Sequence, residues 1–280
     1  MIFDERRAEA MAQVLRRDVL TMIYQAGDGH PGPSLSCADI MAALYFGILH
    51  VDPANPHGDA RDRFILSKGH ACPILYAALA RRGFFPLSEL PTLRHLGSRL
   101  QGHPDMRKTP GVDSTSGSLG HGVSIGVGMA LAARYRKQDH RVFVLTGDGE
   151  LEEGIIWEAA MAAAKYELGR LVVLVDNNGL QSGGSIDVVS RVNPLVDKWT
   201  SFGWHVQGVD GHDCGAIAAA VEGALAVPSQ PSVVIAATVK GAGVPFMEGD
   251  NSWHKRVPTA DELRQALVAL GGDPNHGFAD

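Results

Sequence analysis

Two short polar turns, joined by an apolar helical segment and a strand, are the residues whose types and spacing suggest chemistry. The first is Gly-Asp-Gly at 147–149, which directly follows the β-branched and aromatic run 141–146. Two glycines beside one carboxylate let a bulky anion approach the backbone, and Asp148 is free to bind a hard cation. The second turn is Asn-Asn at 177–178, which follows the apolar run 171–176. Both runs have the length and composition of buried strands.

The segment between the two turns has the pattern of a helix that covers a sheet. Its apolar residues recur at helical spacing, at positions 155, 156, 159, 160 and 163. A strand, a helix and a second strand in succession predict a right-handed parallel crossover. The two turns then meet at the carboxyl edge of the sheet, where open parallel sheets bind ligands.

Asp148 and Asn178 are therefore predicted to bind one cation together, with a backbone carbonyl near Leu180. A site with so few protein oxygens takes its other ligands from phosphate and water, which favours Mg²⁺ over Ca²⁺. The residues leave a second interpretation open, because each turn alone is also an ordinary loop sequence. Their joint position at one sheet edge favours the metal site.

Further apolar runs alternate with helical stretches along the chain, which predicts an α/β fold, a parallel sheet with helices on both faces. The expected helices cover 4–26, 36–49 with Ser36 as its cap, the residues after His70, 214–226 and 259–270. Further strands are expected within 204–213 and at 232–238. The polar segment 51–62 is expected to be an exposed loop, and 97–128 a long irregular segment that continues into a helix.

The stretch 147–179 also resembles a known family. Gly-Asp-Gly followed after about thirty residues by Asn-Asn is similar to the thiamine diphosphate signature, and LTGDGELEEGIIWEAA and VDNNGLQ resemble transketolase. The resemblance runs from Ala8 to about Leu270 with the motifs in order. It implies thiamine diphosphate and Mg²⁺ as cofactors. It also implies a single diphosphate-binding (PP-type) domain over 1–280. The tail after about 271 is expected to be loosely ordered, as chain ends usually are.

Four histidines match positions that the family uses. His30 lies in a loop of glycines and prolines that holds it rigidly, which suits proton transfer or hydroxyl binding. The resemblance implies that His30, His103 and His254 contact the sugar and act in catalysis, that His70 binds the cofactor, and that His254 lies near both. Without the resemblance, a lone loop histidine is more often simply solvated.

The glycine-rich segment supplies further cofactor contacts by resemblance. Gly117, Ser118 and Leu119, together with Gly120, match the turn that meets the diphosphate side of the cofactor, and Gly149 is expected to approach the diphosphate.

The sequence departs from the family pattern at two positions. Asp28 stands where transketolases usually have serine, which concerns substrate preference more than chemistry, and His121 stands where they usually have glutamine.

Glu153 and Glu158 follow the first turn and resemble the acidic residues that meet the partner at the subunit interface and link two active sites. Glu153 is accordingly predicted to belong to the cofactor site. The alternative is a pair of exposed carboxylates, which the start of a helix favours by itself.

Composition limits the function classes and the compartment. The net charge is −6 and the basic residues are scattered, which argues against nucleic acid and anionic membranes as partners. Cys37, Cys72 and Cys214 are odd in number and contain no CxxC pair, which fits a reducing cytosol. The first residues lack an apolar secretory core, and no apolar run approaches about 18 residues, the length that a membrane span requires.

The family resemblance predicts the N-terminal subunit of a split transketolase. A full transketolase continues into a pyrimidine-binding half that carries the activating glutamate, so the partner is expected to be that half, in an α2β2 heteromer that transfers a two-carbon ketol unit between sugars. Three alternatives remain open. They are an E1-type subunit that decarboxylates 2-oxo acids, a regulatory half that binds cofactor without turnover, and a transketolase for a sulfonated or branched ketose. The four histidines favour transketolase over the E1-type protein.

Overall fold

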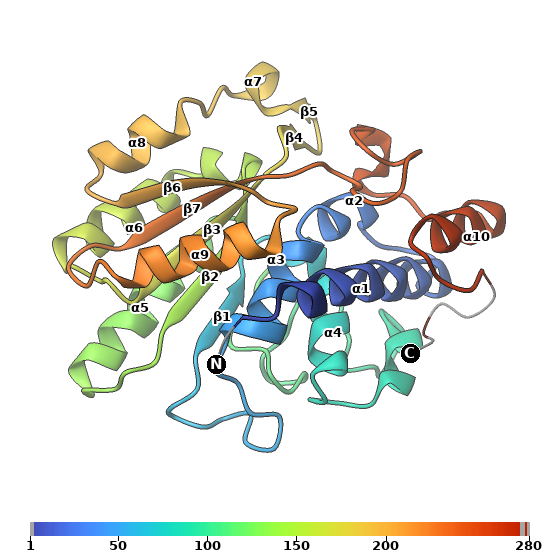
Figure 1. Cartoon of the computed structure of the whole chain (residues 1–280), viewed down its shortest axis with the longest axis horizontal. Helices are drawn as coiled ribbons and strands as arrows, with labels where there is room; N and C mark the ends of the chain where they lie inside the picture. Colours follow the sequence, from blue (N-terminus) through green and yellow to red (C-terminus); the bar gives the residue numbers. More distant parts are fainter. Residues whose placement is uncertain (1–2, 275–277, 279–280) are drawn as a thin grey trace.

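The computed structural model describes residues 3–274 and 278, and its centre is one five-stranded sheet (Figure 1). The order across the sheet is β1-β2-β3-β7-β6, and every neighbouring pair is parallel. The strands are β1 (Arg63–Leu66), β2 (Val142–Gly147), β3 (Leu171–Asn177), β6 (His205–Asp210) and β7 (Ser232–Ala237). The predicted crossover between the two turns is confirmed, because β2 and β3 are parallel neighbours.

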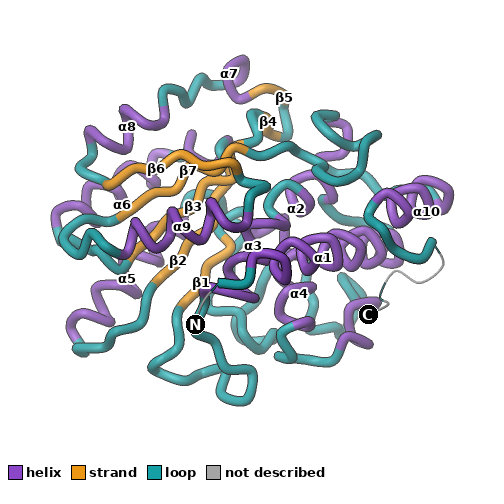
Figure 2. Tube along the Cα trace, in the orientation of Figure 1, coloured by secondary structure: helices purple, strands orange, loops and turns teal. Residues whose placement is uncertain are grey.

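Helices cover both faces of the sheet, as predicted (Figure 2). The larger core joins one face to α1 (Glu5–Ala26), α3 (Ala38–Ala43), α4 (Cys72–Arg81) and α9 (Cys214–Leu225). The second core joins the other face to α5 (His121–Tyr135), α6 (Gly154–Lys165) and α8 (Leu195–Ser201). Side chains of β2 alternate between the two cores, with Phe143 and Leu145 in the first and Val142 and Val144 in the second.

Several shorter elements connect or flank the strands and long helices. They are α2 (Pro31–Leu35), a π-helical turn (Leu44–Ile48), the 3-10 turns Gly69–Ala71, Leu87–Thr92, Gly149–Glu152 and Asn251–His254, a hairpin of β4 (Leu180–Gln181) and β5 (Gly184–Ser185), α7 (Ile186–Val189) and α10 (Ala260–Ala269). The predicted start of α10 is confirmed, and Thr259 forms a capping box there with Glu262.

The segment 36–49 is helical from Ala38 to Ile48 but is not one α-helix, and the predicted start at Ser36 was wrong. Pro31 starts α2 inside the segment expected to be a loop, because proline is well suited to the first position of a helix. The next helix, α3, ends at Ala43 and continues as the π-helical turn. Ser36 is not the N-cap of α3, which is Cys37, and the Ser36 hydroxyl instead donates to the buried carboxylate of Asp176 at 2.5 Å.

Two regions lacked a usable sequence signal. The edge strand β1 has four residues, and the elements between 180 and 201 have two to seven. Such lengths are too short for periodicity to be recognised. Of the tail predicted to be loosely ordered, residues 275–277 and 279–280 lie outside the described residues. Within the described part of the chain, no helix combines the length and apolarity needed to cross a bilayer.

Candidate active site

The carboxyl edge of the sheet borders a cavity of about 360 Å³, here called the edge cavity. The residues that follow β1, β2, β3 and β7 all contribute to it, as the topology of a parallel sheet requires. Its lining is His30, Pro33, Lys68, His70, Gly117, Leu119, Gly147, Asp148, Gly149, Glu150, Asp176, Asn178, Leu180, Gln181, Ser182, Lys240 and His254.

The two polar turns meet in this cavity, as the sequence predicted. One carboxylate oxygen of Asp148 accepts a hydrogen bond from the backbone N–H of Gly149 at 2.8 Å, and the other accepts from that of Gly179 at 2.5 Å. The side-chain oxygen of Asn178 accepts from the N–H of Leu180 at 3.1 Å. The turn after β2 is thus joined directly to the turn after β3.

The oxygen atoms in these turns fit a hard divalent cation. Asp148, Asn178 and Leu180 offer a carboxylate, an amide oxygen and a backbone carbonyl, which are ligands that Mg²⁺ accepts. Burial, and after it the neighbouring Asp176, raises the pKa of Asp148 to about 6. A cation here would stabilise the ionised form of Asp148. No group of three or more His, Cys, Asp or Glu side chains able to hold a metal occurs among residues 3–274 and 278.

Three histidines face one another in the edge cavity. The ring centroids of His30, His70 and His254, here called the histidine cluster, lie 5.1 to 5.6 Å apart. Burial is the main cause that lowers their pKa values, to about 4, 2 and 3 respectively, and nearby positive charges add to it. All three rings are therefore neutral at pH 7, and each can donate one hydrogen bond and accept another. The buried Nδ1 atom of His30 has no hydrogen-bond partner among the described residues.

The predicted glycine-rich turn lies against the first polar turn. Buried Glu150 accepts hydrogen bonds from the N–H groups of Gly120 at 2.7 Å and Gly147 at 3.2 Å, so it joins the two turns. Gly117 and Leu119 line the edge cavity, whereas Ser118 does not.

His103 and Glu153 lie outside the lining of the edge cavity. A Cβ atom on Gly117 would lie 3.5 Å from the ring of His103, so this histidine lies against the turn. Glu153 is exposed and precedes the first residue of α6, and Glu158 is exposed on the same helix. The assignment of Glu153 to the cofactor site stays a prediction.

Sequence reasoning missed the charged residues beneath the turns. Lys68 and Asp176 form a buried ion pair at 2.5 Å, and Asp176 also accepts from the side-chain amide of Asn178 at 3.2 Å. The buried ammonium of Lys240 donates to the carbonyl of Leu180 at 3.3 Å and lies 2.9 Å from Nδ1 of His254. The sequence signal that could have identified the two lysines is their position, because each lies within three residues after the carboxyl end of a strand.

This arrangement can hold a diphosphate and neutral reacting groups in one place. Lys240, whose pKa burial lowers to about 8, the glycines of the two turns and a cation at Asp148 provide positive charge and close backbone approach. The histidine cluster lies beside them and offers neutral donors and acceptors for hydroxyl groups.

Comparisons with known proteins identify the family of this chain. The family model for the thiamine diphosphate binding domain of transketolase matches residues 7–279. The 6-deoxy-6-sulfo-D-fructose transketolase subunit SqwG of Clostridium sp. (strain MSTE9) is 45% identical over 259 residues, which are 92% of this chain and 94% of that protein. An apulose-4-phosphate transketolase subunit from Phocaeicola vulgatus is 41% identical over 92% of each chain.

A solved transketolase has the same fold. The structure of the Pichia stipitis enzyme in complex with sedoheptulose-7-phosphate superposes with a TM-score of 0.93 at 33% identity, over 98% of this chain and 42% of that chain. This chain thus spans less than half of the solved transketolase and nearly all of the two related subunits. It belongs to the transketolase family and corresponds to the thiamine diphosphate-binding N-terminal part of that family.

Proposed function

We propose that this chain is the diphosphate-binding subunit of a two-subunit transketolase, which transfers a two-carbon ketol unit from an acidic ketose to an aldose. The observation that carries the proposal is the meeting of the two polar turns and the histidine cluster in one cavity. The names of the relatives support it, since proteins of nearly the same length are named transketolase subunits.

Thiamine diphosphate and Mg²⁺ are the proposed cofactors. Asp148, Asn178 and the carbonyl of Leu180 would bind the metal, and Gly149, Gly117 and Leu119 would lie against the diphosphate. Further contacts are proposed for Ser118, His70, His254 and Lys240. When bound, thiamine diphosphate supplies the stabilisation of a carbanion, which protein side chains do not provide.

The chain's own residues would orient the sugar and move protons. His30 and His254 are neutral and face each other, so His30 can accept a proton from a sugar hydroxyl and return it, and His254 can donate a hydrogen bond to a hydroxyl. His103 is proposed to bind a sugar hydroxyl beside the glycine-rich turn. The ammonium of Lys240 donates to Nδ1 of His254, so the hydrogen of that neutral ring is on Nε2, and the lysine charge also disfavours protonation of the ring.

A sulfonated or branched ketose is the second candidate donor class. The two relatives described above carry 6-deoxy-6-sulfo-D-fructose and apulose-4-phosphate in their names, which favours a donor outside the common sugar phosphates. An E1-type activity that decarboxylates 2-oxo acids is not favoured, because the relatives are transketolases and the histidine cluster suits a sugar with several hydroxyl groups.

The partner is proposed to be a pyrimidine-binding subunit, in an α2β2 assembly. The proposed interface consists of the turn Gly149–Glu152, the glycine-rich turn 117–120 and the exposed side of α5 and α6 with Glu153 and Glu158. Two exposed apolar side chains support it, Ile125 on α5 and Met161 on α6, since apolar groups on a surface favour association. The three buried free thiols support a reducing cytosol as the compartment.

The test is reconstitution. The purified chain with thiamine diphosphate and Mg²⁺ should not transfer a ketol unit from D-xylulose 5-phosphate or 6-deoxy-6-sulfo-D-fructose until the pyrimidine-binding subunit is added. Activity should then saturate at equal amounts of the two chains. Full turnover by this chain alone would disprove the two-subunit proposal.

A further inference from the structure

Three charged side chains border the histidine cluster and are not part of the edge cavity. Nη1 of Arg94 lies 2.9 Å from one carboxylate oxygen of Asp28, and Nζ of Lys255 lies 3.7 Å from the other. Asp28 precedes His30 by two residues, and Lys255 directly follows His254. These residues, here called the charge triad, are partly exposed, with side-chain exposures of 25% for Arg94, 40% for Asp28 and 58% for Lys255.

The backbone around Arg94 fixes its position. Arg94 has a φ of 61°, a left-handed conformation that is unfavourable for a residue with a side chain and that often occurs at functional sites. Its N–H donates to the carbonyl of Leu100 at 2.8 Å. Its guanidinium lies against Gly102, where an added Cβ atom would come within 2.7 Å of Cζ. Only glycine at 102 leaves room for the guanidinium in this position.

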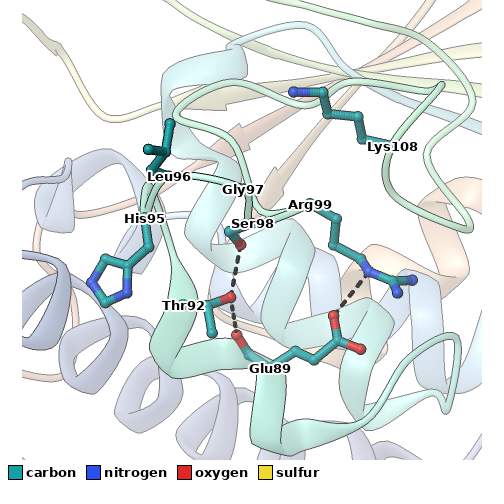
Figure 3. Close-up of a pocket in the computed structure, with 8 residues that line it drawn as sticks. All are labelled: Glu89, Thr92, His95, Leu96, Gly97, Ser98, Arg99 and Lys108. Carbon is teal, nitrogen blue, oxygen red and sulfur yellow. Dashed lines mark hydrogen bonds and ion pairs between the residues drawn. The ribbon is translucent and has the colours of Figure 1, made fainter.

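Side-chain contacts brace the same loop. Figure 3 shows the hydroxyl of Thr92 between Ser98 and Glu89, at 2.7 Å from the Ser98 hydroxyl and 2.8 Å from the Glu89 carbonyl. Beside it, Arg99 forms an ion pair with Glu89 at 2.9 Å. These contacts close the loop on both sides of Arg94, so the guanidinium is held toward Asp28.

The charge triad lies close enough to the proposed sugar-binding histidines to influence them. After burial, the positive charges of Arg94 and then Lys255 are the main causes that lower the pKa of His30. Arg94 is also the second cause, after burial, of the lowered pKa of His103. A sugar bound between these histidines would therefore have the charge triad within electrostatic reach.

The charge balance suggests what the charge triad selects. Two cations face one carboxylate, so the group carries one excess positive charge. A terminal group with a single negative charge would neutralise that excess. A phosphate dianion would exceed it and would lie next to the carboxylate of Asp28, and like charges in contact are unfavourable.

We propose that Asp28, Arg94 and Lys255 determine specificity for a sugar whose terminal group is a monoanion, such as a sulfonate, over a phosphate dianion. Asp28 disfavours the second negative charge, and the two cations attract the first. The inference rests on the proposed function, because it names the substrate class of the same site.

The test compares two donors on the complex reconstituted with the partner subunit, thiamine diphosphate and Mg²⁺. The wild type should have a higher kcat/KM for 6-deoxy-6-sulfo-D-fructose than for D-fructose 6-phosphate at pH 8, where phosphate is a dianion. Asp28→Asn should shift this ratio toward the phosphate by about tenfold, mainly through KM, because a unit charge near the ligand is removed. Lys255→Met should raise KM for both anionic donors more than for neutral L-erythrulose, because one of the two attracting cations is lost.

Asp261→Asn is the matched control, because it also removes an exposed carboxylate paired with an arginine, Arg264 at 2.8 Å, on the distant helix α10. An equal effect of Asp28→Asn on both anionic donors would overturn the inference. Calorimetric affinities of the two donors for the wild-type and Asp28→Asn complexes provide a readout without turnover. If the complex turned over no donor, charged or neutral, the proposed function would fail. Equal changes in the affinities of the two anionic donors on Asp28→Asn would overturn the role of the charge triad and leave the proposed function intact.

Discussion

Burial of Asp148 favours the protonated form of its carboxyl group, whereas the proposed metal binding requires the ionised form. The carboxyl group is buried beside Asp176, which raises its pKa to about 6, so ionising it costs free energy in the chain alone. Two backbone N–H groups hold it in one orientation despite that cost. A residue kept in an unfavourable ionisation state but in a fixed orientation is typical of a binding site.

We therefore expect Asp148→Ala to abolish metal-dependent cofactor binding. The variant loses the only carboxylate among the three proposed metal ligands, and affinity for thiamine diphosphate in the presence of Mg²⁺ should fall by at least about 100-fold. Isothermal titration calorimetry measures this directly. Unchanged affinity would remove Asp148 from the metal site.

Substitution of His30 should impair use of the sugar substrate and leave the affinity for the cofactor nearly unchanged. Its Nδ1 has no hydrogen-bond partner among the described residues, and the metal ligands are on other loops. His30→Ala in the reconstituted complex should raise KM or lower kcat by about 10 to 1,000-fold and leave thiamine diphosphate affinity within about twofold. A collapse of cofactor affinity would contradict the role assigned to His30.

Among the elements, the start of α5 is fixed to the ends of β1 and β2. The N–H of Gly122 donates to the Ser67 hydroxyl at 3.2 Å, and that hydroxyl donates to Glu150, which also holds Gly120 and Gly147. A Cβ atom on Gly122 would lie 2.3 Å from this hydroxyl oxygen. The helix can approach the sheet edge this closely only with glycine at 122.

Two glycine substitutions in α5 should therefore have opposite effects. Gly122→Ala should lower the free energy of unfolding by about 1–3 kcal/mol, because the helix start must move away from β1. Gly128→Ala should raise it by up to about 1 kcal/mol, because that glycine is exposed, has open space around it, and alanine favours helix. Urea unfolding of both variants measures the difference. Equal stabilities would contradict the close approach.

At the scale of the whole molecule, the buried neutral histidines link stability to pH. The pKa of His70 is lowered to about 2 by burial and then by Lys68, against about 6.5 in an unfolded chain. Below pH 6.5 the unfolded chain gains a proton at this residue and the folded chain does not. His70 thus supports full stability above pH 6.5, and stability is lost as the pH falls toward the folded pKa.

We expect His70→Asn to flatten this dependence. Between pH 6.5 and 4.5, the wild-type chain without cofactor should lose about 2 kcal/mol more than the variant, since one proton is taken up on unfolding. Urea midpoints at several pH values provide the comparison, and the difference between the two proteins removes the contribution of other groups. Parallel curves would show that His70 is protonated in the folded chain.

The sequence by itself determined the core of the fold and the centre of the site. The crossover from β2 through α6 to β3 is local, and its buried runs and helical spacing follow from which residues must leave water. The two polar turns at its ends could therefore be assigned to one edge of the sheet. The histidines were located by their motifs, and the resemblance supplied their roles.

Only the tertiary structure decided the charged surroundings of that site. Lys68 and Asp176 are 108 residues apart, and Arg94 and Asp28 are 66 apart, so no local pattern joins them. Whether a lysine is buried against a carboxylate or extends into water depends on which distant segments close around it. A charge in the interior persists only with a partner at hydrogen-bonding distance, and that partner is known only when the chain is folded.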